Sequence, residues 1–274
     1  MPVSFVSHLG FGCAALTGEP TSGSARRLLE TAYDAGIRHF DTAPGYGAGY
    51  SERVLGAFLK GKREGITVVT KIGSGRPASS LPSCLALPLN RVRRWLLGKP
   101  ALAVRNPSPP LLTPRRIPRT LVEASVMQSL RSLRTDYIDV LLLHEGLPSF
   151  LETAAYDYLR TLQSSGVVGS LGVAAHGSNY LPLQPVELEG WHVLQYEYGA
   201  EWPRHRELST RFPSKRHIFH SCLGAGCSTR LNPGAHLAGI LRAAPGATVL
   251  FFSRQPAHIR SNIRDGEAAW RAAF

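Results

Sequence analysis

The sequence contains no apolar run that approaches the roughly 18 residues needed for a membrane-spanning helix. The N-terminal stretch MPVSFVSHLGFGCAALTG has no charged start before its apolar part, so we expect no signal peptide. Cysteine is scarce, and Cys13, Cys84, Cys222 and Cys227 form no CxxC pair. Neither a zinc site nor a disulfide framework is therefore predicted, and a reduced cytoplasmic location is the expectation.

Acidic residues are missing between Glu64 and Glu123, although the whole chain has 19 of them against 31 Lys and Arg. Residues 76–119 hold nine Lys or Arg and nine of the twenty prolines. A solvated, proline-rich loop is the simplest interpretation. The alternative is a patch that attracts phosphate, nucleic acid or anionic lipid. Trp95 is the only aromatic residue there, so stacking on nucleic-acid bases is poorly supported.

Eight apolar, strand-like runs alternate with helix-like segments. The strands are expected at Leu9–Ala14, Arg38–Ala43, Thr67–Ile72, Tyr137–His144, Ser170–Ala175, His192–Tyr198, His217–Cys222 and Thr248–Ser253. Several of these runs are apolar almost throughout, which is typical of parallel strands buried on both faces. The pattern predicts an α/β fold, a (β/α)8 barrel, as a single domain over residues 1–274. Residues 74–118 would form a long basic, proline-rich insertion after the third strand.

The segments between the strands carry ordinary helix signals. Ser22 or Ser24 could cap the first long helix and Gly36 could end it. A doubly wound open sheet is the alternative fold, but it would require a glycine-rich phosphate loop after the first strand. LGFGCAALTGEP has only G-x-G, so that signal is weak.

Four polar side chains are expected at one end of the barrel, because residues at the carboxyl ends of barrel strands share one mouth. Asp41 ends the second strand, Tyr46 lies in the following loop, Lys71 is near the end of the third strand and His144 ends the fourth. Each alone has an ordinary structural explanation, such as a turn cap, a loop aromatic or a core histidine. Lys71 is harder to explain that way, because an unpaired ammonium in an apolar strand is costly to bury.

Together the four groups suit the reduction of a carbonyl. A carbonyl that receives hydride develops negative charge on oxygen, which requires a proton donor and fixed electrostatic stabilisation. We expect Lys71 to lower the pKa of the Tyr46 phenol, and Asp41 to hold Lys71 charged. His144 would donate to the carbonyl oxygen and orient it.

The motifs resemble those of the aldo-keto reductase superfamily, in particular its bacterial members. The matching stretches are LGFGC at 9–13, AYDAGIRHFDTAPGYG with SE at 32–52, VVTKIG at 68–73, SLRSLRTDYIDVLLLH at 129–144 and SLGVA at 170–174. The resemblance implies a (β/α)8 barrel that binds a nicotinamide cofactor, usually NADPH with NADH as the alternative. It also implies that Tyr46 is the general acid, supported by Asp41, Lys71 and His144.

The resemblance implies cofactor contacts at the later strands, where the sequence departs from the family pattern. Ala174 and Ala175 stand where Ser-Asn usually holds the nicotinamide carboxamide, and Gln195 matches a family glutamine that also contacts that group. His220 replaces the usual aromatic residue that stacks on nicotinamide. Ser221 and Leu223 follow it in the same cofactor segment.

The adenosine end of the cofactor would lie after the eighth strand. Ser253 and Arg254 are the expected contacts of the 2′-phosphate, with His258 at a position where Arg is frequent. Asn262 matches the asparagine that contacts adenine. The helix before the eighth strand is expected to be curtailed, because the chain there is short.

Two other functions stay open at this point. Lys71 could form a Schiff base in a non-redox lyase, although a neighbouring Asp41 would keep the lysine charged. The barrel could instead be a binding or regulatory protein that uses its basic insertion. His205, His217 and His220 lack the spacing and the carboxylate of a metal site, so we predict no metal and expect surface or strand histidines. A small-molecule aldehyde or ketone is the expected partner, whereas the substrate and the oligomeric state cannot be predicted.

Overall fold

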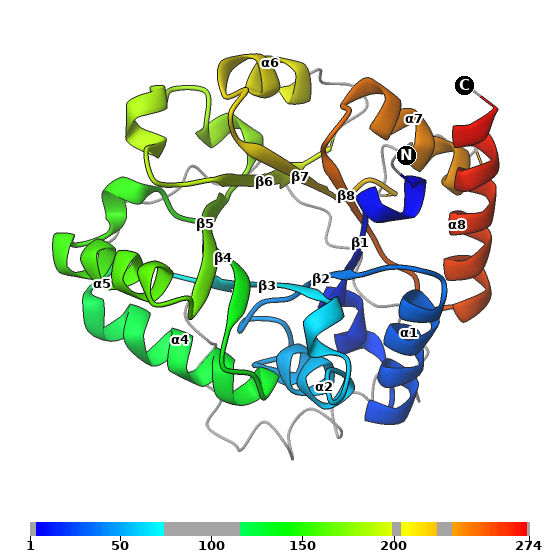
Figure 1. The fold of residues 1–274 in the computed structure, drawn as a ribbon, viewed down its shortest axis with the longest axis horizontal. Coiled ribbons are helices and arrows are strands. Elements are labelled where there is room, and N and C mark those ends of the chain that lie inside the picture. The colour runs from blue at the N-terminus through cyan, green and yellow to red at the C-terminus, as the bar shows by residue number, and fades with distance from the viewer. Residues whose placement is uncertain (1–3, 74–115, 199–203, 224–231, 273–274) are drawn as a thin grey trace, which may run out of the picture.

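The computed structural model describes residues 4–73, 116–198, 204–223 and 232–272. Eight parallel strands form a closed barrel in the order β1 to β8, with β1 hydrogen-bonded to β8 (Figure 1). The strands are β1 (Leu9–Gly12), β2 (His39–Asp41), β3 (Thr67–Ile72), β4 (Ile138–His144), β5 (Val168–Ala174), β6 (Val193–Glu197), β7 (Arg216–His220) and β8 (Thr248–Phe251). The fold prediction is confirmed, and each expected strand overlaps an observed one.

Helices cover the outside of this ring (Figure 1). The α-helices are α1 (Ser22–Asp34), α2 (Tyr50–Phe58), α4 (Arg119–Leu133), α5 (Thr153–Ser164), α6 (Arg204–Arg211), α7 (Pro233–Ala243) and α8 (Pro256–Arg271). The 3₁₀ turns are η1 (Phe5–His8), η2 (Cys13–Gly18), η3 (Arg63–Gly65), η4 (Pro148–Phe150), η5 (Gly177–Asn179) and η6 (Pro185–Leu188). Because each helix returns the chain to the same end, the strands are all parallel and their carboxyl ends meet at one mouth.

The strands are buried on both faces, as their apolar composition predicts. One apolar cluster fills the barrel interior and consists of Val69, Val140, Leu142, Ala174, Val193, Ile218 and Leu250. A much larger cluster lies between the strands and the helices. β4 illustrates the arrangement, because Leu142 belongs to the inner cluster and its neighbours Leu141 and Leu143 belong to the outer one.

Two details differ from the sequence predictions. Thr21 is the N-cap of α1, where its hydroxyl accepts from the Ser24 backbone N–H at 3.0 Å. Ser24 is the reciprocal partner in this capping box rather than the cap itself. α7 spans 11 residues and is capped by the Asn232 side chain, so it is not curtailed. The predicted insertion at 74–118 falls almost entirely outside the described residues.

Candidate active site

The structure brings the four predicted catalytic side chains together at the carboxyl ends of the strands. Lys71 Nζ donates to Asp41 Oδ1 at 2.6 Å and lies 5.3 Å from the centre of the Tyr46 ring. The Tyr46 and His144 rings are 6.4 Å apart between centroids and meet edge to face at 89°. An acid, an amine, a phenol and an imidazole therefore surround one small volume at the mouth.

Lys71 and Asp41 form a buried ion pair. The two residues are only 1% and 3% exposed, and Lys71 Nζ also donates to the Thr42 carbonyl at 2.9 Å. Burial lowers the pKa of Lys71, but the charge of Asp41 and the contact with Tyr46 outweigh it, and the net shift is upward. Lys71 is therefore held as an ammonium at neutral pH.

The Tyr46 phenol differs from the expectation. Burial raises its pKa above the ordinary value, and the Lys71 ammonium lowers it without reversing that effect. The predicted lowering of the Tyr46 pKa by Lys71 is therefore present, but burial outweighs it and the net shift is upward. A phenol with a raised pKa carries its proton at neutral pH, so the group is present in the form that can donate.

The backbone after β2 aims Tyr46 through a tight left-handed turn. Gly47, Ala48 and Gly49 have φ values of 60°, 52° and 82°. Three consecutive positive φ values reverse the chain within a few residues, and glycine adopts them without the steric cost that a side chain brings. The turn is closed by a hydrogen bond from the Ser51 N–H to the Tyr46 carbonyl at 3.3 Å.

The Ser-Glu pair that follows this turn anchors α2 to the barrel. Ser51 and Glu52 are both fully buried. The Ser51 hydroxyl donates to the Cys13 carbonyl at 2.9 Å, and Glu52 Oε1 accepts from the Thr70 hydroxyl at 2.9 Å. These contacts join α2 to η2 and to β3, and they hold the α2 end of the Tyr46 loop relative to Lys71.

Two predicted cofactor residues lie at the mouth on neighbouring strands. Gln195 on β6 is 2% exposed, and its Nε2 donates to Asp41 Oδ2 at 2.7 Å. His220 ends β7, where burial lowers its pKa to about 4, so the imidazole is neutral at pH 7. Its Nδ1 lies 2.9 Å from the hydroxyl of Ser221, which has a φ of 60°. Leu223 is partly buried against the outer core.

The four remaining predicted cofactor residues lie along the segment from β8 into α8. The Ser253 hydroxyl accepts from the Gln255 N–H at 3.1 Å, just before α8 begins. The Arg254 side chain lies against Gly18, since a Cβ on that glycine would be 2.9 Å from Arg254 Nη1. The structure thus brings the loops after β1 and β8 together.

The last two of these residues differ in exposure. His258 is exposed in the first turns of α8, whereas Asn262 is only 7% exposed. The Asn262 backbone packs closely against α7, since a Cβ on Gly234 would be 2.4 Å from the Asn262 carbonyl oxygen.

Sequence reasoning missed a contact between a histidine and a carboxylate at the mouth. His176 Nε2 lies 2.8 Å from Glu197 Oε1, and Glu197 Oε2 accepts from the Gly177 N–H at 2.9 Å. The same rule that selected Asp41 could have found both residues, because His176 follows β5 and Glu197 ends β6. The Cys13 thiol was also missed. It is buried beside Asp41 and Lys71, and burial raises its pKa.

The two other histidines that were considered as metal ligands, His217 and His205, pack against tyrosine side chains. His217 is buried on β7, with Nδ1 2.9 Å from the Tyr196 hydroxyl. His205 is buried rather than exposed, and its ring lies 4.9 Å from that of Tyr198. Within the described part of the chain, no group of three or more His, Cys, Asp or Glu side chains is arranged to hold a metal ion.

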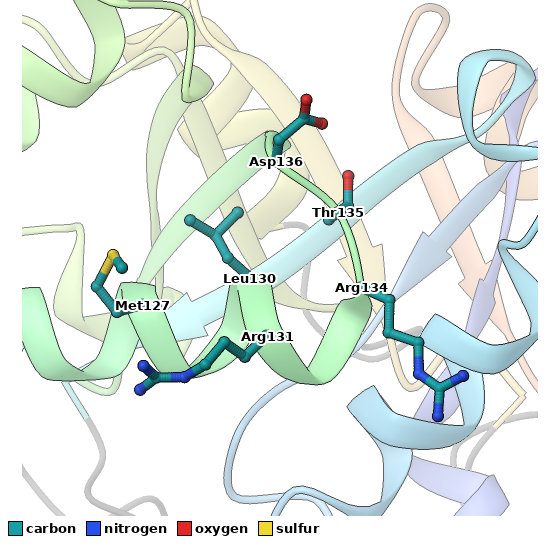
Figure 2. Close-up of a pocket in the computed structure, with 6 residues that line it drawn as sticks. All are labelled: Met127, Leu130, Arg131, Arg134, Thr135 and Asp136. Carbon is teal, nitrogen blue, oxygen red and sulfur yellow. The ribbon is translucent and has the colours of Figure 1, made fainter.

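A hollow of about 480 Å³ lies elsewhere, on the outer side of α4 (Figure 2). It is lined by Met127, Leu130, Arg131, Arg134, Thr135 and Asp136. These residues come from the last turns of α4 and the connection to the start of β4, at the end of the barrel opposite the mouth. The hollow is thus separate from the candidate active site.

The fold and the mouth define a class of parallel barrels with polar groups at the carboxyl ends of the strands. The model of the Aldo/keto reductase family matches residues 8–182, more than half of the chain. The chain therefore belongs to the aldo/keto reductase family. The matched region contains Asp41, Tyr46, Lys71 and His144.

Curated relatives agree with this assignment. The chain is 31% identical over 191 residues to D-threo-aldose 1-dehydrogenase of a Pseudomonas species, a match that covers 64% of the chain and 52% of the relative. It is 32% identical over 210 residues to the NADH-specific methylglyoxal reductase of Escherichia coli, covering 71% of the chain and 56% of the relative. The matches thus span about half the length of these curated relatives.

Solved structures share the fold at low sequence identity. An aldo-keto reductase from Bacillus halodurans in its holo form has a TM-score of 0.69 at 18% identity, covering 97% of this chain and 92% of the other. An aldo-keto reductase from Klebsiella pneumoniae in complex with NADPH has a TM-score of 0.61 at 17% identity, covering 97% and 86%. In the ranges that the structure describes, none of the helices combines the length and apolar character required to cross a bilayer.

Proposed function

We propose that the protein is an NAD(P)H-dependent oxidoreductase that reduces an aldehyde or ketone to an alcohol, or catalyses the reverse oxidation. The observation that carries this proposal is the contact between the buried Lys71–Asp41 ion pair and the Tyr46 phenol at the mouth, with His144 facing the same phenol. A proton donor beside a fixed positive charge is what a carbonyl oxygen requires as negative charge develops on it.

Each side chain then has a distinct role. Tyr46 is the general acid, and its hydroxyl gives a proton to the carbonyl oxygen. Lys71 stabilises the phenolate that remains, and Asp41 fixes the ammonium in place. His144, whose ring meets the Tyr46 ring edge to face, orients the carbonyl oxygen by hydrogen bonding.

The residues present fit a nicotinamide dinucleotide. Arg254 places a guanidinium at the mouth beside the N-terminus of the 16-residue helix α8, and both favour a bound phosphate. We propose that Ser253, Arg254 and His258 hold the 2′-phosphate of NADPH, and that Asn262 lies near the adenine. The bound cofactor supplies hydride. His220 and Ser221, at the end of β7, would lie at the nicotinamide end with Leu223.

The cofactor preference is proposed as NADPH, with NADH as the alternative. NADPH is bound by the solved relative from Klebsiella pneumoniae, and the basic Arg254 suits an additional phosphate. The curated relative from Escherichia coli is named as NADH-specific. The names of relatives also include a D-threo-aldose dehydrogenase and a pyridoxal 4-dehydrogenase, the latter 46% identical over 71 residues. All of these names agree with a small carbonyl compound or its alcohol as the substrate.

The geometry disfavours a lyase in which Lys71 forms a Schiff base. A lysine nucleophile must be neutral to attack a carbonyl, whereas Asp41 and Tyr46 raise the pKa of Lys71. A binding role through the basic insertion is the other alternative, and that segment lies outside the described residues. The described mouth supports the reductase.

The reductase proposal is tested by Tyr46→Phe. Removal of the phenol hydroxyl should lower the turnover number by about 10²–10⁴-fold, because a positioned general acid contributes that much. The dissociation constant of NADPH, measured by fluorescence titration, should change little, because the phenyl ring is retained. Tyr158→Phe, on the outer helix α5, is the control and should leave both quantities unchanged. An equal loss of turnover and cofactor binding would contradict the assigned role.

A further inference from the structure

One hydrogen bond of the site crosses the barrel from one wall to the other. Gln195 belongs to β6 and Asp41 to β2, and three strands separate β2 from β6 on either side of the ring (Figure 1). The 2.7 Å contact from Gln195 Nε2 to Asp41 Oδ2 therefore joins opposite walls of the barrel. It links residues that are 154 positions apart in the chain.

This contact completes the coordination of the Asp41 carboxylate. Oδ1 accepts from the Lys71 ammonium at 2.6 Å, and Oδ2 accepts from the Gln195 amide. An ionised carboxylate only accepts hydrogen bonds, so the amide must present its NH₂ group to Asp41 rather than its oxygen. Two donors on different strands fix the rotation of the carboxylate, which one donor alone would leave free.

Few neighbouring groups could replace the Gln195 amide as a hydrogen-bond donor to the Asp41 carboxylate. Directly below, the barrel interior is filled by the apolar cluster that includes Val69, Leu142 and Val193. Gln195 itself is held firmly, because its backbone carbonyl accepts from the Ala175 N–H at 3.1 Å and from the Tyr180 hydroxyl at 3.0 Å. A rigid strand therefore presents the amide to Asp41.

We propose that Gln195 is a positioning residue that acts on Tyr46 through Asp41 and Lys71, without touching the carbonyl substrate. Its amide holds the carboxylate, the carboxylate holds the ammonium, and the ammonium stays beside the phenol. The expected contact of Gln195 with the nicotinamide is a different role, since it would act directly on cofactor affinity. This inference rests on the proposed reductase function.

The test separates the two roles by comparing hydride transfer with cofactor affinity. Gln195→Met keeps the length of the side chain and removes the donor. With 4-nitrobenzaldehyde as the probe, the single-turnover rate at saturating NADPH should fall by about ten- to a hundredfold, as expected for a misplaced catalytic group. The dissociation constant of NADPH should stay within about twofold. Gln163→Met, on the outer helix α5, is the matched control and should change neither quantity. A loss of NADPH affinity as large as the loss of rate would overturn the proposal.

A double-mutant cycle tests whether Gln195 acts through Asp41. In an Asp41→Asn background, Gln195→Met should cause no further loss of rate, because the carboxylate that it positions is already gone. Losses that multiply would show that Gln195 acts by another route, and would overturn the proposal.

Gln195→Glu provides a rescue that a purely structural role would not show. The introduced carboxyl opposes Asp41 at neutral pH, but its protonated form can donate as the amide does. The rate relative to wild type should therefore recover as the pH falls. Lys71, Tyr46, Cys13, His39 and His220 also interact with Asp41, so the wild-type pH profile is the reference. A pH-independent ratio of the two rates would count against the proposal.

Failure of the reductase function gives a different result from failure of this inference. If wild-type protein transfers no hydride to the probe, the proposed function is wrong, and the cycle is repeated on the free energy of unfolding in urea. Non-additive effects of Asp41→Asn and Gln195→Met would still support the contact, and additive effects would refute it. If wild-type protein is active and Gln195→Met is equally active, only the positioning role is wrong.

Discussion

Lys71 sits in a buried strand, and its partners explain how it can be there. An unpaired ammonium would be strongly disfavoured at 1% exposure, but Asp41 Oδ1 and the Thr42 carbonyl accept from it at 2.6 and 2.9 Å. The same pair acts in opposite directions on Tyr46, since Lys71 lowers the pKa of the phenol while Asp41 raises it. The net shift of the Tyr46 pKa depends on how deeply the phenol is buried, and the identity of a residue alone does not give its burial.

Burial also changes the pKa of a second residue near the site, His39. It lies on β2, two residues before Asp41, and its Nε2 is buried without a hydrogen-bond partner among the described residues. Burial, followed by opposing effects of nearby charges, lowers its pKa from 6.5 to about 4. The folded protein therefore binds this proton more weakly than the unfolded chain does.

We predict that this histidine makes the protein sensitive to acid. Between pH 6.5 and about 4 the unfolded state takes up the proton and the folded state does not, so stability is present above that window and is lost as the pH falls through it. The loss attributable to one such group is at most about 3 kcal/mol. Urea unfolding of wild type and His39→Leu across this pH range should show a smaller decline for the variant. The same decline in both proteins would rule out His39 as the source.

At the scale of elements, short side chains and close backbones set the positions of the helices. Gly56 on α2 illustrates this, because a Cβ at that position would lie 2.3 Å from the Ser132 carbonyl oxygen of α4. The two helices can approach so closely only with glycine there. α2 carries Ser51 and Glu52, so its placement also determines the shape of the loop that holds Tyr46.

Gly56→Ala should destabilise the protein by about 1–3 kcal/mol, the usual result of inserting a methyl group into a packed contact. The measurement is the midpoint of urea unfolding. Gly65→Ala in η3 is the matched control, because a Cβ there meets no heavy atom within 4 Å. The control should change the free energy of unfolding only slightly. Equal effects of the two substitutions would show that the α2–α4 contact is looser than the structure has it.

Local sequence patterns predict the presence of strands and helices better than the residues at which they begin and end. The expected strand Thr67–Ile72 matches β3 at both ends, and Gly73 directly follows its last apolar residue. The sequence predicts Ser22 or Ser24 as the cap of α1, whereas Thr21 is the cap in the structure. Thr and Ser are both good caps, so only the hydrogen-bond geometry of the folded turn decides between neighbours.

At the scale of the whole molecule, the barrel and the convergence of the four side chains could be predicted because both follow from the order of the strands. Alternating strands and helices place the carboxyl end of every strand at one mouth. This rule alone predicts that Asp41, Tyr46, Lys71 and His144 lie close together. The hydrogen bond from Gln195 to Asp41 could not be predicted, since its partners lie on opposite walls. The net shift of the Tyr46 pKa was also inaccessible, because burial arises only when the loop folds over the barrel.

In the proposed function, the side chains at this mouth all serve a single event, the transfer of hydride to a carbonyl carbon. The most direct measurement uses two preparations of NADPH, each with deuterium on a different face of C4 of the nicotinamide. Each is mixed with the protein and 4-nitrobenzaldehyde, and the alcohol is analysed by mass spectrometry. The account predicts that deuterium from one face only appears on the alcohol carbon, and that Tyr46→Phe suppresses its appearance. Unlabelled alcohol from both preparations, or no alcohol with cofactor bound, would contradict it.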